Sequence, residues 1–188
     1  EQEWLRPMLE EIVMNLFMKS NLGLKARVTV GAATSMLDLV TDVYVANMFW
    51  RDKKYGYFKA SLASLAVSIG LQIFIVWVQN KKLGMTKVLR EWIPILLGYK
   101  PAVDAYRVAT GAKQEVGTAL DPMVEMTLMK EVEMFAEAIP GVIIQLMAIA
   151  TSDKDVGTSA WLSVAVSAIT TGFASASISY DWDTDPVK

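Results

Sequence analysis

The sequence predicts an all-α membrane protein: a polytopic transmembrane helical bundle with about four spanning helices, one broken or re-entrant segment and an N-terminal interfacial helix. Two stretches carry no charged residue, Ala60 to Asn80 over 21 residues and Val156 to Tyr180 over 25. About 20 apolar residues are enough to cross a bilayer as a helix. The composition agrees, because 53% of the 188 residues are hydrophobic and only 20% are charged.

The composition also excludes several kinds of chemistry, because the chain contains no cysteine and no histidine. Without cysteine there is no disulfide scaffold, no thiol catalysis and no cysteine-ligated zinc or iron–sulfur site. Without histidine, the usual general base and the commonest transition-metal ligand are missing. We therefore expect no cofactor, no metal and no enzyme activity, since no nucleophile–base pair is visible. A net charge of −2 argues against a nucleic-acid partner.

Residues 1–27 are predicted to form an amphipathic N-terminal helix and a linker. The apolar residues that repeat at helical spacing in this segment are Leu5, Met8, Leu9, Ile12, Val13, Leu16 and Phe17. Such a helix, expected at residues 4–20, lies on a membrane surface or on a partner, or packs as an ordinary helix. Asn21-Leu22-Gly23 is expected to end it.

The transmembrane helical domain is predicted over residues 28–180, followed by a polar tail at 181–188. Its first two spans are expected at 28–50 and 57–80, separated by the polar turn at residues 51–54. Seven basic residues flank the spans on the N-terminal side: Lys19, Lys25, Arg27, Lys81, Lys82, Lys87 and Arg90. Only Arg51, Lys53 and Lys54 flank the other side. Because basic residues gather on the cytoplasmic side, we expect a cytoplasmic N-terminus, in a plasma membrane or an organelle membrane.

The segment from Glu91 to Gly111 does not form a clean span. Prolines and glycines interrupt it, and it carries three further charges, at Lys100, Asp104 and Arg107. A broken or re-entrant membrane helix fits this pattern, because irregular backbone is tolerated at membrane depth where protein surrounds it. An excursion along the membrane surface is the alternative.

Two further spans are expected at 122–152 and 157–180. Asp121 is a suitable N-cap for the first of them, with Pro122 at the first helical position. Pro140 is expected to bend this helix, because proline has no N–H and frees the backbone carbonyl four residues earlier, near residue 136.

Several polar residues lie inside the predicted spans, where they are costly. Asp38 and Asp42 are four residues apart and share a helix face, and each carboxylate costs roughly 2.5–3.5 kcal/mol at mid-bilayer. They must face protein, water or a cationic partner, or carry a proton. Gln72 also needs a partner, which we expect across the bundle.

A second row of polar positions follows one face of the helix at 122–152. Its members are three or four residues apart: Lys130, Glu133, Glu137, Gly141 and Gln145. A solvated surface would not explain Glu137 beside the apolar run or Gln145 inside it. We therefore expect Glu137 and Gln145 to converge with Asp38, Asp42 and Gln72 on one interior groove, with Lys130 beside a carboxylate.

The last span carries small residues at steps of four, which allow helices to approach closely. One stripe consists of Ser163, Ser167, Thr171, Ser175 and Ser179, and the neighbouring one of Ala160, Val164, Ala168, Gly172 and Ala176. These stripes are candidates for the contact of a homodimer or with a similar helical membrane partner. Packing within the monomer is the competing interpretation.

Two of these segments resemble the XK-related (Xkr) family of membrane proteins. The segment SMLDLVTDV at residues 35–43 is similar to the LDLxTD segment that opens the family's domain. KEVEMFAEAIPGVIIQ at residues 130–145 is similar to a second family segment, which it matches at Lys130, Glu133, Phe135, Glu137, Pro140 and Gln145. The resemblance covers roughly residues 28–180, and it corresponds to the first half of family members, which are about twice as long.

The resemblance implies a function at the membrane. Several Xkr proteins scramble phospholipids between leaflets without ATP, and charged residues inside their helices are thought to form the lipid path. By this resemblance Asp38, Asp42, Lys130, Glu133 and Glu137 are lipid-path residues here. Gln72 and Gln145, which are costly inside the spans, complete the predicted lipid path. A small cation channel or transporter and a non-catalytic helical subunit of a larger membrane assembly remain the alternatives.

Overall fold

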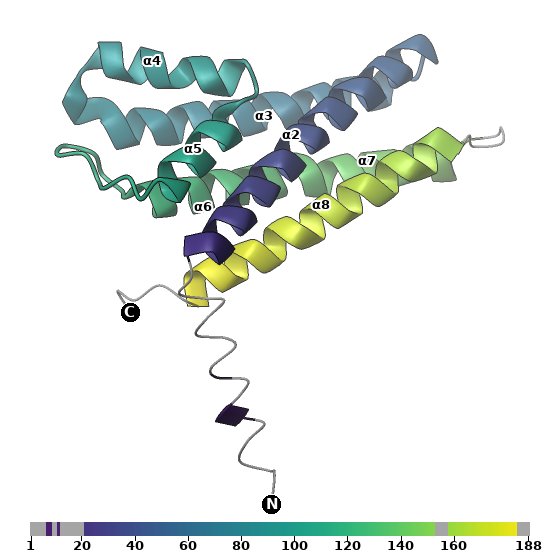
Figure 1. Ribbon diagram of the computed structural model, residues 1–188. Coiled ribbons are helices and arrows are strands. Elements are labelled where there is room, and N and C mark those ends of the chain that lie inside the picture. Colours follow the sequence, from purple (N-terminus) through teal and green to yellow (C-terminus); the bar gives the residue numbers. More distant parts are fainter. Residues whose placement is uncertain (1–6, 9–10, 12–20, 153–157, 184–188) are drawn as a thin grey trace, which may run out of the picture.

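The computed structural model describes residues 7–8, 11, 21–152 and 158–183, and over these residues it is a bundle of helices without strands (Figure 1). Four helices are long and apolar enough to cross a membrane: Gly23–Arg51, Tyr55–Leu83, Pro122–Ala150 and Ala160–Tyr180. The predicted fold class is therefore confirmed. Most of the interfacial helix expected at residues 4–20, and the tail beyond residue 183, lie outside the described residues.

The first two spans form an antiparallel pair. Helix α2 (Asn21–Arg51) and helix α3 (Tyr55–Asn80) are joined by a short turn in which Lys53 has a φ of 58°. A 3₁₀ turn, η1 (Lys81–Leu83), follows α3. The prediction that Asn21-Leu22-Gly23 ends a helix was wrong, because these residues are the first turn of α2. The first N–H groups of a helix have no intrahelical partner, so polar residues and glycine are tolerated there.

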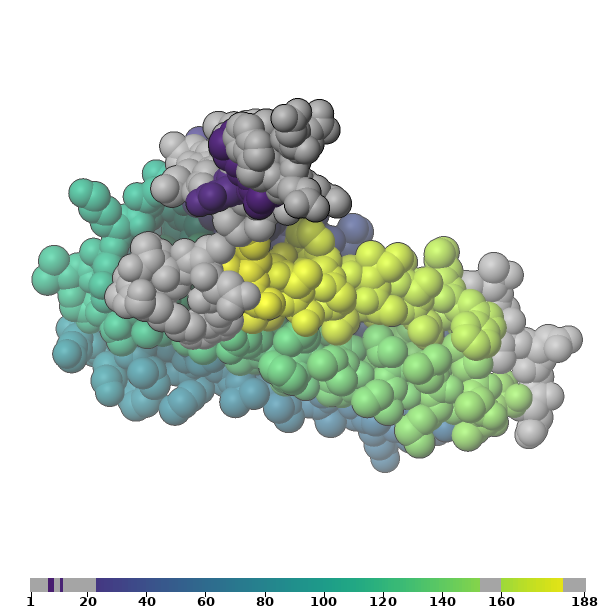
Figure 2. All heavy atoms as spheres, turned by 90° about the horizontal axis from the view of Figure 1, so that it is seen from below, coloured from purple at the N-terminus to yellow at the C-terminus, as the bar shows by residue number. Residues whose placement is uncertain are grey.

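The third span is a single rod made of three parts. Helix α6 (Pro122–Glu133) passes into one π-helical turn, η2 (Met134–Ala138), and then into α7 (Ile139–Ala150). Asp121 caps α6 as predicted, since its Oδ1 accepts hydrogen bonds from the backbone N–H groups of Met123 and Val124 at 2.8 and 3.1 Å. Helix α8 (Thr158–Asp183) then runs back along the rod and forms much of one outer face (Figure 2).

The interrupted segment forms a helical hairpin of α4 (Met85–Leu96) and α5 (Lys100–Ala109). The hairpin begins and ends at the same end of the bundle, where the N–H of Ala119 donates to the carbonyl of Gln79 at 3.2 Å (Figure 1). Its turn contains Gly98, whose φ is +75° and whose Cα lies against the side chain of Leu39, near the middle of α2. The hairpin thus enters and leaves the bundle at one end, as a re-entrant segment does.

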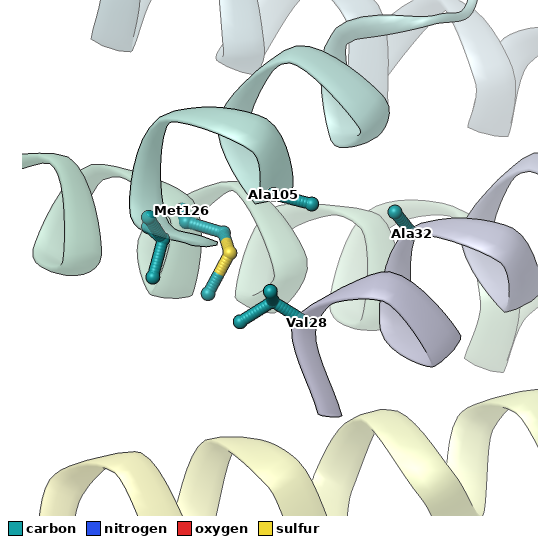
Figure 3. Close-up of a cluster of buried hydrophobic side chains, with 5 residues drawn as sticks. Val28, Ala32, Ala105 and Met126 are labelled. Carbon is teal, nitrogen blue, oxygen red and sulfur yellow. The ribbon is translucent and has the colours of Figure 1, made fainter. Parts of the chain in front are cut away.

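Helix α5 is wedged between α2 and α6. Small and medium apolar side chains fill the contact: Val28, Ala32, Ala105, Val108 and Met126 (Figure 3). The two alanines allow the α2 and α5 backbones to approach closely. Outside this core, large apolar side chains cover the bundle surface; Val40, Leu97 and Ile169 are 65%, 69% and 70% exposed. A surface of this kind is suited to lipid rather than to water.

Candidate functional site

A polar groove runs between α2 and α3, with α6, η2 and α7 behind it. It consists of two cavities of about 260 and 430 Å³, which share Val43, Leu65 and Glu137 in their walls. The smaller one, here the hairpin cavity, lies beside the Gly98 turn, and the larger one, the turn cavity, lies toward the turn between α2 and α3. All seven predicted residues line the groove: Asp38, Asp42, Gln72, Lys130, Glu133, Glu137 and Gln145.

In the hairpin cavity, α2 and α3 each contribute a polar side chain held by hydroxyl groups. Thr170 Oγ1 of α8 donates to Asp38 Oδ1 at 3.1 Å. Gln72 is buried and donates through Nε2 to Ser68 Oγ at 3.3 Å. The partner of Gln72 thus lies one turn away on its own helix and not across the bundle, because the Ser68 hydroxyl is close enough to satisfy the amide locally. Ser68 in turn faces Glu137.

Lys130 reaches the hairpin cavity from α6 and is 6% exposed. Its Nζ lies 3.0 Å from the point where a Cβ on Gly31 would stand, so the glycine makes room for the ammonium group against α2. Lys130 and Glu133 lie close enough for their charges to interact, and Ser35 of α2 faces Glu133. Lys130 and Glu133 therefore line the same cavity.

The π-helical turn places Glu137 where the two cavities meet. Pro140 cannot donate a hydrogen bond to the carbonyl of Ala136, and the Oγ of Ser64 donates to this oxygen at 2.6 Å. The sequence predicted a freed backbone carbonyl near residue 136, and the structure shows that a hydroxyl group from α3 donates to this carbonyl. Because the wide turn is held from the side in this way, Glu137 lines both the hairpin cavity and the turn cavity.

The turn cavity combines carboxylates and an amide with aromatic walls. Asp42 lies beside Gly141, where a Cβ would be 3.6 Å from its Oδ1, so the glycine brings α7 close to α2. Gln145 is 5% exposed, and its Oε1 has no hydrogen-bond partner among the described residues. Trp50 and Phe58 form the apolar side of the cavity, with ring centroids 5.1 Å apart.

A second group of buried charges was not assigned to a site from the sequence. Lys100, at 1% exposed, bonds to Asp104 and, at 2.8 Å, to Glu125 Oε1. Gln79 Nε2 donates to the other oxygen of Glu125 at 3.2 Å, completing what we call the ion cluster. The available signal was the spacing of Lys100 and Asp104, four residues apart on a segment too interrupted to span.

A neighbouring ion pair joins α4 to α5. Arg107 Nη2 bonds to Glu91 Oε1 at 2.6 Å. Burial alone would raise the pKa of Glu91, but the hydrogen bond and charge of Arg107, with the charges of Lys100 and Lys87, hold it below its ordinary value. Both groups of ion pairs fasten the hairpin; of their members, only Lys100 also lines the groove.

Comparison with known proteins identifies one family. The family model of the XK-related protein matches residues 27–180. This range contains the hairpin and every residue that lines the groove. No curated protein and no solved structure matches the chain.

Proposed function

Because the chain belongs to the XK-related family and is an integral membrane protein, we propose that it scrambles phospholipids between leaflets along the polar groove. The observation that carries the proposal is the convergence of seven polar side chains from separate helices on one groove inside an apolar bundle. A groove of this kind is costly to maintain in a membrane protein. Polar groups at membrane depth accordingly mark pathways for polar cargo.

The chemistry of the groove suits a phospholipid head group. A zwitterionic head group must cross about 30 Å of hydrocarbon, while its tails can stay in lipid. Asp38, Asp42 and Glu137 offer partners to an ammonium group, and Lys130 offers one to a phosphate. These contacts lower a barrier and supply no energy, so lipid moves in both directions and toward equilibrium. ATP is not needed for such a process.

The groove does not run the whole length of the bundle. Near the N-terminal end of α2 the space is filled by the apolar cluster around Val28 and Met126 (Figure 3). On the proposed function, a head group therefore crosses fully only when the hairpin shifts or when a second copy or a related partner completes the path. We also propose that this end faces the cytoplasm, because the basic residues gather there.

The direct test is a fluorescent-lipid scrambling assay with the purified chain in liposomes, run beside an ion-flux assay. Glu137→Gln is expected to slow lipid exchange by about tenfold or more, as a barrier raised by about 1.4 kcal/mol would. Glu115→Gln is the matched control, because Glu115 is exposed in a loop and should leave the rate unchanged. A correctly inserted chain that exchanges no lipid contradicts the proposal.

Cation passage is a second candidate, which the excess of carboxylates in the groove favours. Four carboxylates line the groove, at Asp38, Asp42, Glu133 and Glu137, against two lysines, Lys100 and Lys130, of which Lys100 is engaged by Asp104 and Glu125. Carboxylates of this kind attract cations in channels. Ion currents from liposomes in which no lipid is exchanged would decide for this function.

We further propose that the chain works as a homodimer or beside a similar helix bundle. On α8, Ser163 and Ser167 are buried within the monomer, whereas Ala168, Gly172 and Ala176 face outward. A Cβ at Gly172 would meet nothing within 4 Å, so a partner helix has access to the backbone. Gly172→Leu is expected to dissociate the pair without unfolding the monomer, which mass measurement in detergent and nanodiscs would detect. A monomer that scrambles at full rate contradicts this assembly.

A further inference from the structure

The turn cavity is lined by a buried hydrogen-bond acceptor that needs a donor. Gln145 is buried and lines the cavity, and no donor among the described residues reaches its Oε1. Buried polar atoms are rarely left without a partner, so such an atom in a cavity wall points to a missing ligand. The ligand that satisfies it must present an N–H or O–H group.

The same cavity favours a positive charge. Asp42 and Glu137 both line it, so two carboxyl groups share one small cavity. Lys130 lines the hairpin cavity instead, and Lys54 Nζ donates to the carbonyl of Ala148 at 3.4 Å. A cation placed between the two carboxyl groups would stabilise their ionised form. The faces of Trp50 and Phe58 add a further favourable wall for a cation.

The rim of the cavity indicates that the ligand is a lipid rather than a free amine. Val43 and Leu62 line the cavity and are 53% and 50% exposed on the apolar outer surface. A head group in the cavity therefore has a continuous apolar path for its acyl chains. A free amine would leave this path without an occupant.

We infer that the turn cavity selects phospholipids with a primary ammonium head group, phosphatidylethanolamine above all. This inference rests on the proposed function. When the Gln145 amide turns its oxygen toward the cavity, an ethanolamine ammonium can donate to it while its charge is shared by Asp42 and Glu137. Choline carries the charge but has no N–H, and glycerol carries no positive charge. The order expected at this site is therefore ethanolamine, then choline, then glycerol.

The experiment measures lipid retention without transport. The full chain is purified in detergent with equal amounts of phosphatidylethanolamine, phosphatidylcholine and phosphatidylglycerol, and the bound lipids are counted by native mass spectrometry. Phosphatidylethanolamine is expected to exceed phosphatidylcholine by about tenfold, within the range for pairing one buried acceptor. Equal retention of the three lipids would overturn the proposal.

Variants at one position link the preference to the acceptor. Gln145→Leu removes the acceptor oxygen and should bring the ratio of bound ethanolamine lipid to bound choline lipid close to one. Gln145→Glu keeps acceptor oxygens at this position and should keep the preference for ethanolamine lipid. Gln114→Leu, in an exposed loop, is the matched control. An unchanged ratio in Gln145→Leu overturns the assignment. If that variant does not fold, the wild-type ratio and Gln145→Glu decide the question.

Two further outcomes distinguish a failure of the proposed scrambling function from a failure of the proposed head-group site. A chain that retains phosphatidylethanolamine selectively but exchanges no lipid in liposomes contradicts scrambling and leaves the site standing. A chain that exchanges all three lipids equally and retains them equally contradicts the site and leaves scrambling standing. Displacement by soluble glycerophosphoethanolamine as effectively as by the lipid would overturn the lipid assignment.

Discussion

The groove and the ion cluster both bury charged groups, but they satisfy them differently. In the ion cluster, Lys100 contacts two carboxylates directly, and Gln79 donates a hydrogen bond to the second oxygen of Glu125. In the groove, Asp38 and Glu137 face hydroxyl groups on one side and a cavity on the other. Opposite charges in direct contact hold one arrangement in place, whereas carboxylates beside a cavity keep the capacity to bind something else. Burial alone therefore does not distinguish a structural charge from a functional one.

The largest expected effect comes from removing the cation of the ion cluster. Lys100→Met leaves Asp104 and Glu125 buried together, and breaking a buried pair typically costs about 3–5 kcal/mol. Thermal unfolding in detergent should show this loss. Lys113→Met is the control, because Lys113 is exposed in a loop and the loss of a surface charge changes stability by less than about 1 kcal/mol. A shift no larger than that of the control would contradict a structural role.

The loss of an aspartate should mainly reduce the rate of lipid exchange in the groove and mainly reduce stability in the ion cluster. Asp38→Ala is expected to slow lipid exchange at least about tenfold while costing about 1 kcal/mol, the value of its hydrogen bond from Thr170. Asp104→Ala should mainly lower the unfolding temperature, with a smaller change in the rate per folded molecule. Both quantities are measured on the same liposome preparations. If the two variants changed rate and stability in the same proportion, the distinction between groove and cluster would fail.

The hairpin turn offers a smaller and more local effect. Gly98→Ala places a Cβ in a left-handed conformation, at a cost of about 1–2 kcal/mol, and against the side chain of Leu39. Gly70→Ala is the matched control, since a Cβ there meets open space and alanine favours a helix by about 0.8–1 kcal/mol. Opposite shifts in unfolding temperature are expected, and a neutral Gly98→Ala would argue against tight seating of the turn.

The smallest expected effect is a dependence on pH through Glu91, which lies outside the four spans. Its pKa is held below the ordinary value of 4.5, so its pairing stabilises the folded chain above that pH. This contribution is lost as the pH falls below 4.5 and through the lower pKa of the folded state. Because Arg107 is partly exposed, we expect a loss below about 1 kcal/mol. Unfolding curves between pH 6 and pH 3 should show a shallower decline in Glu91→Gln, and an equal decline would exclude this pair as the cause.

The spans and the groove were predictable because their signals are local. Uncharged runs of the length of a bilayer identify a span without any knowledge of its neighbours, and the row from Lys130 to Gln145 follows one helix face. The effect of Pro140 was equally local, since the missing N–H affects the carbonyl of Ala136 wherever the helix lies. What the sequence did not show is that Ser64 would supply the donor.

Contacts between distant segments were not predictable in this way. Lys100 bonds to Glu125, which lies 25 residues later in the sequence, and no periodic pattern connects the two residues. The serine stripe of α8 shows a different limit. A step of four residues advances about 400° around a helix, so the stripe turns by about 40° at every step. Ser163 and Ser167 are accordingly buried while Ser175 and Ser179 are exposed, and the buried polar face continues through Thr170 and Ser177.

The bond between Lys100 and Glu125 also has a consequence for the order in which the segments fold. Lys100 leaves the ribosome 25 residues ahead of Glu125, a delay of roughly 1–5 s at common translation rates. During this interval the hairpin carries an ammonium group without one of its two carboxylates, which disfavours deep insertion into the bilayer. We therefore expect the hairpin to settle only once α6 has been made, with the third span as the template on which the segment before it folds.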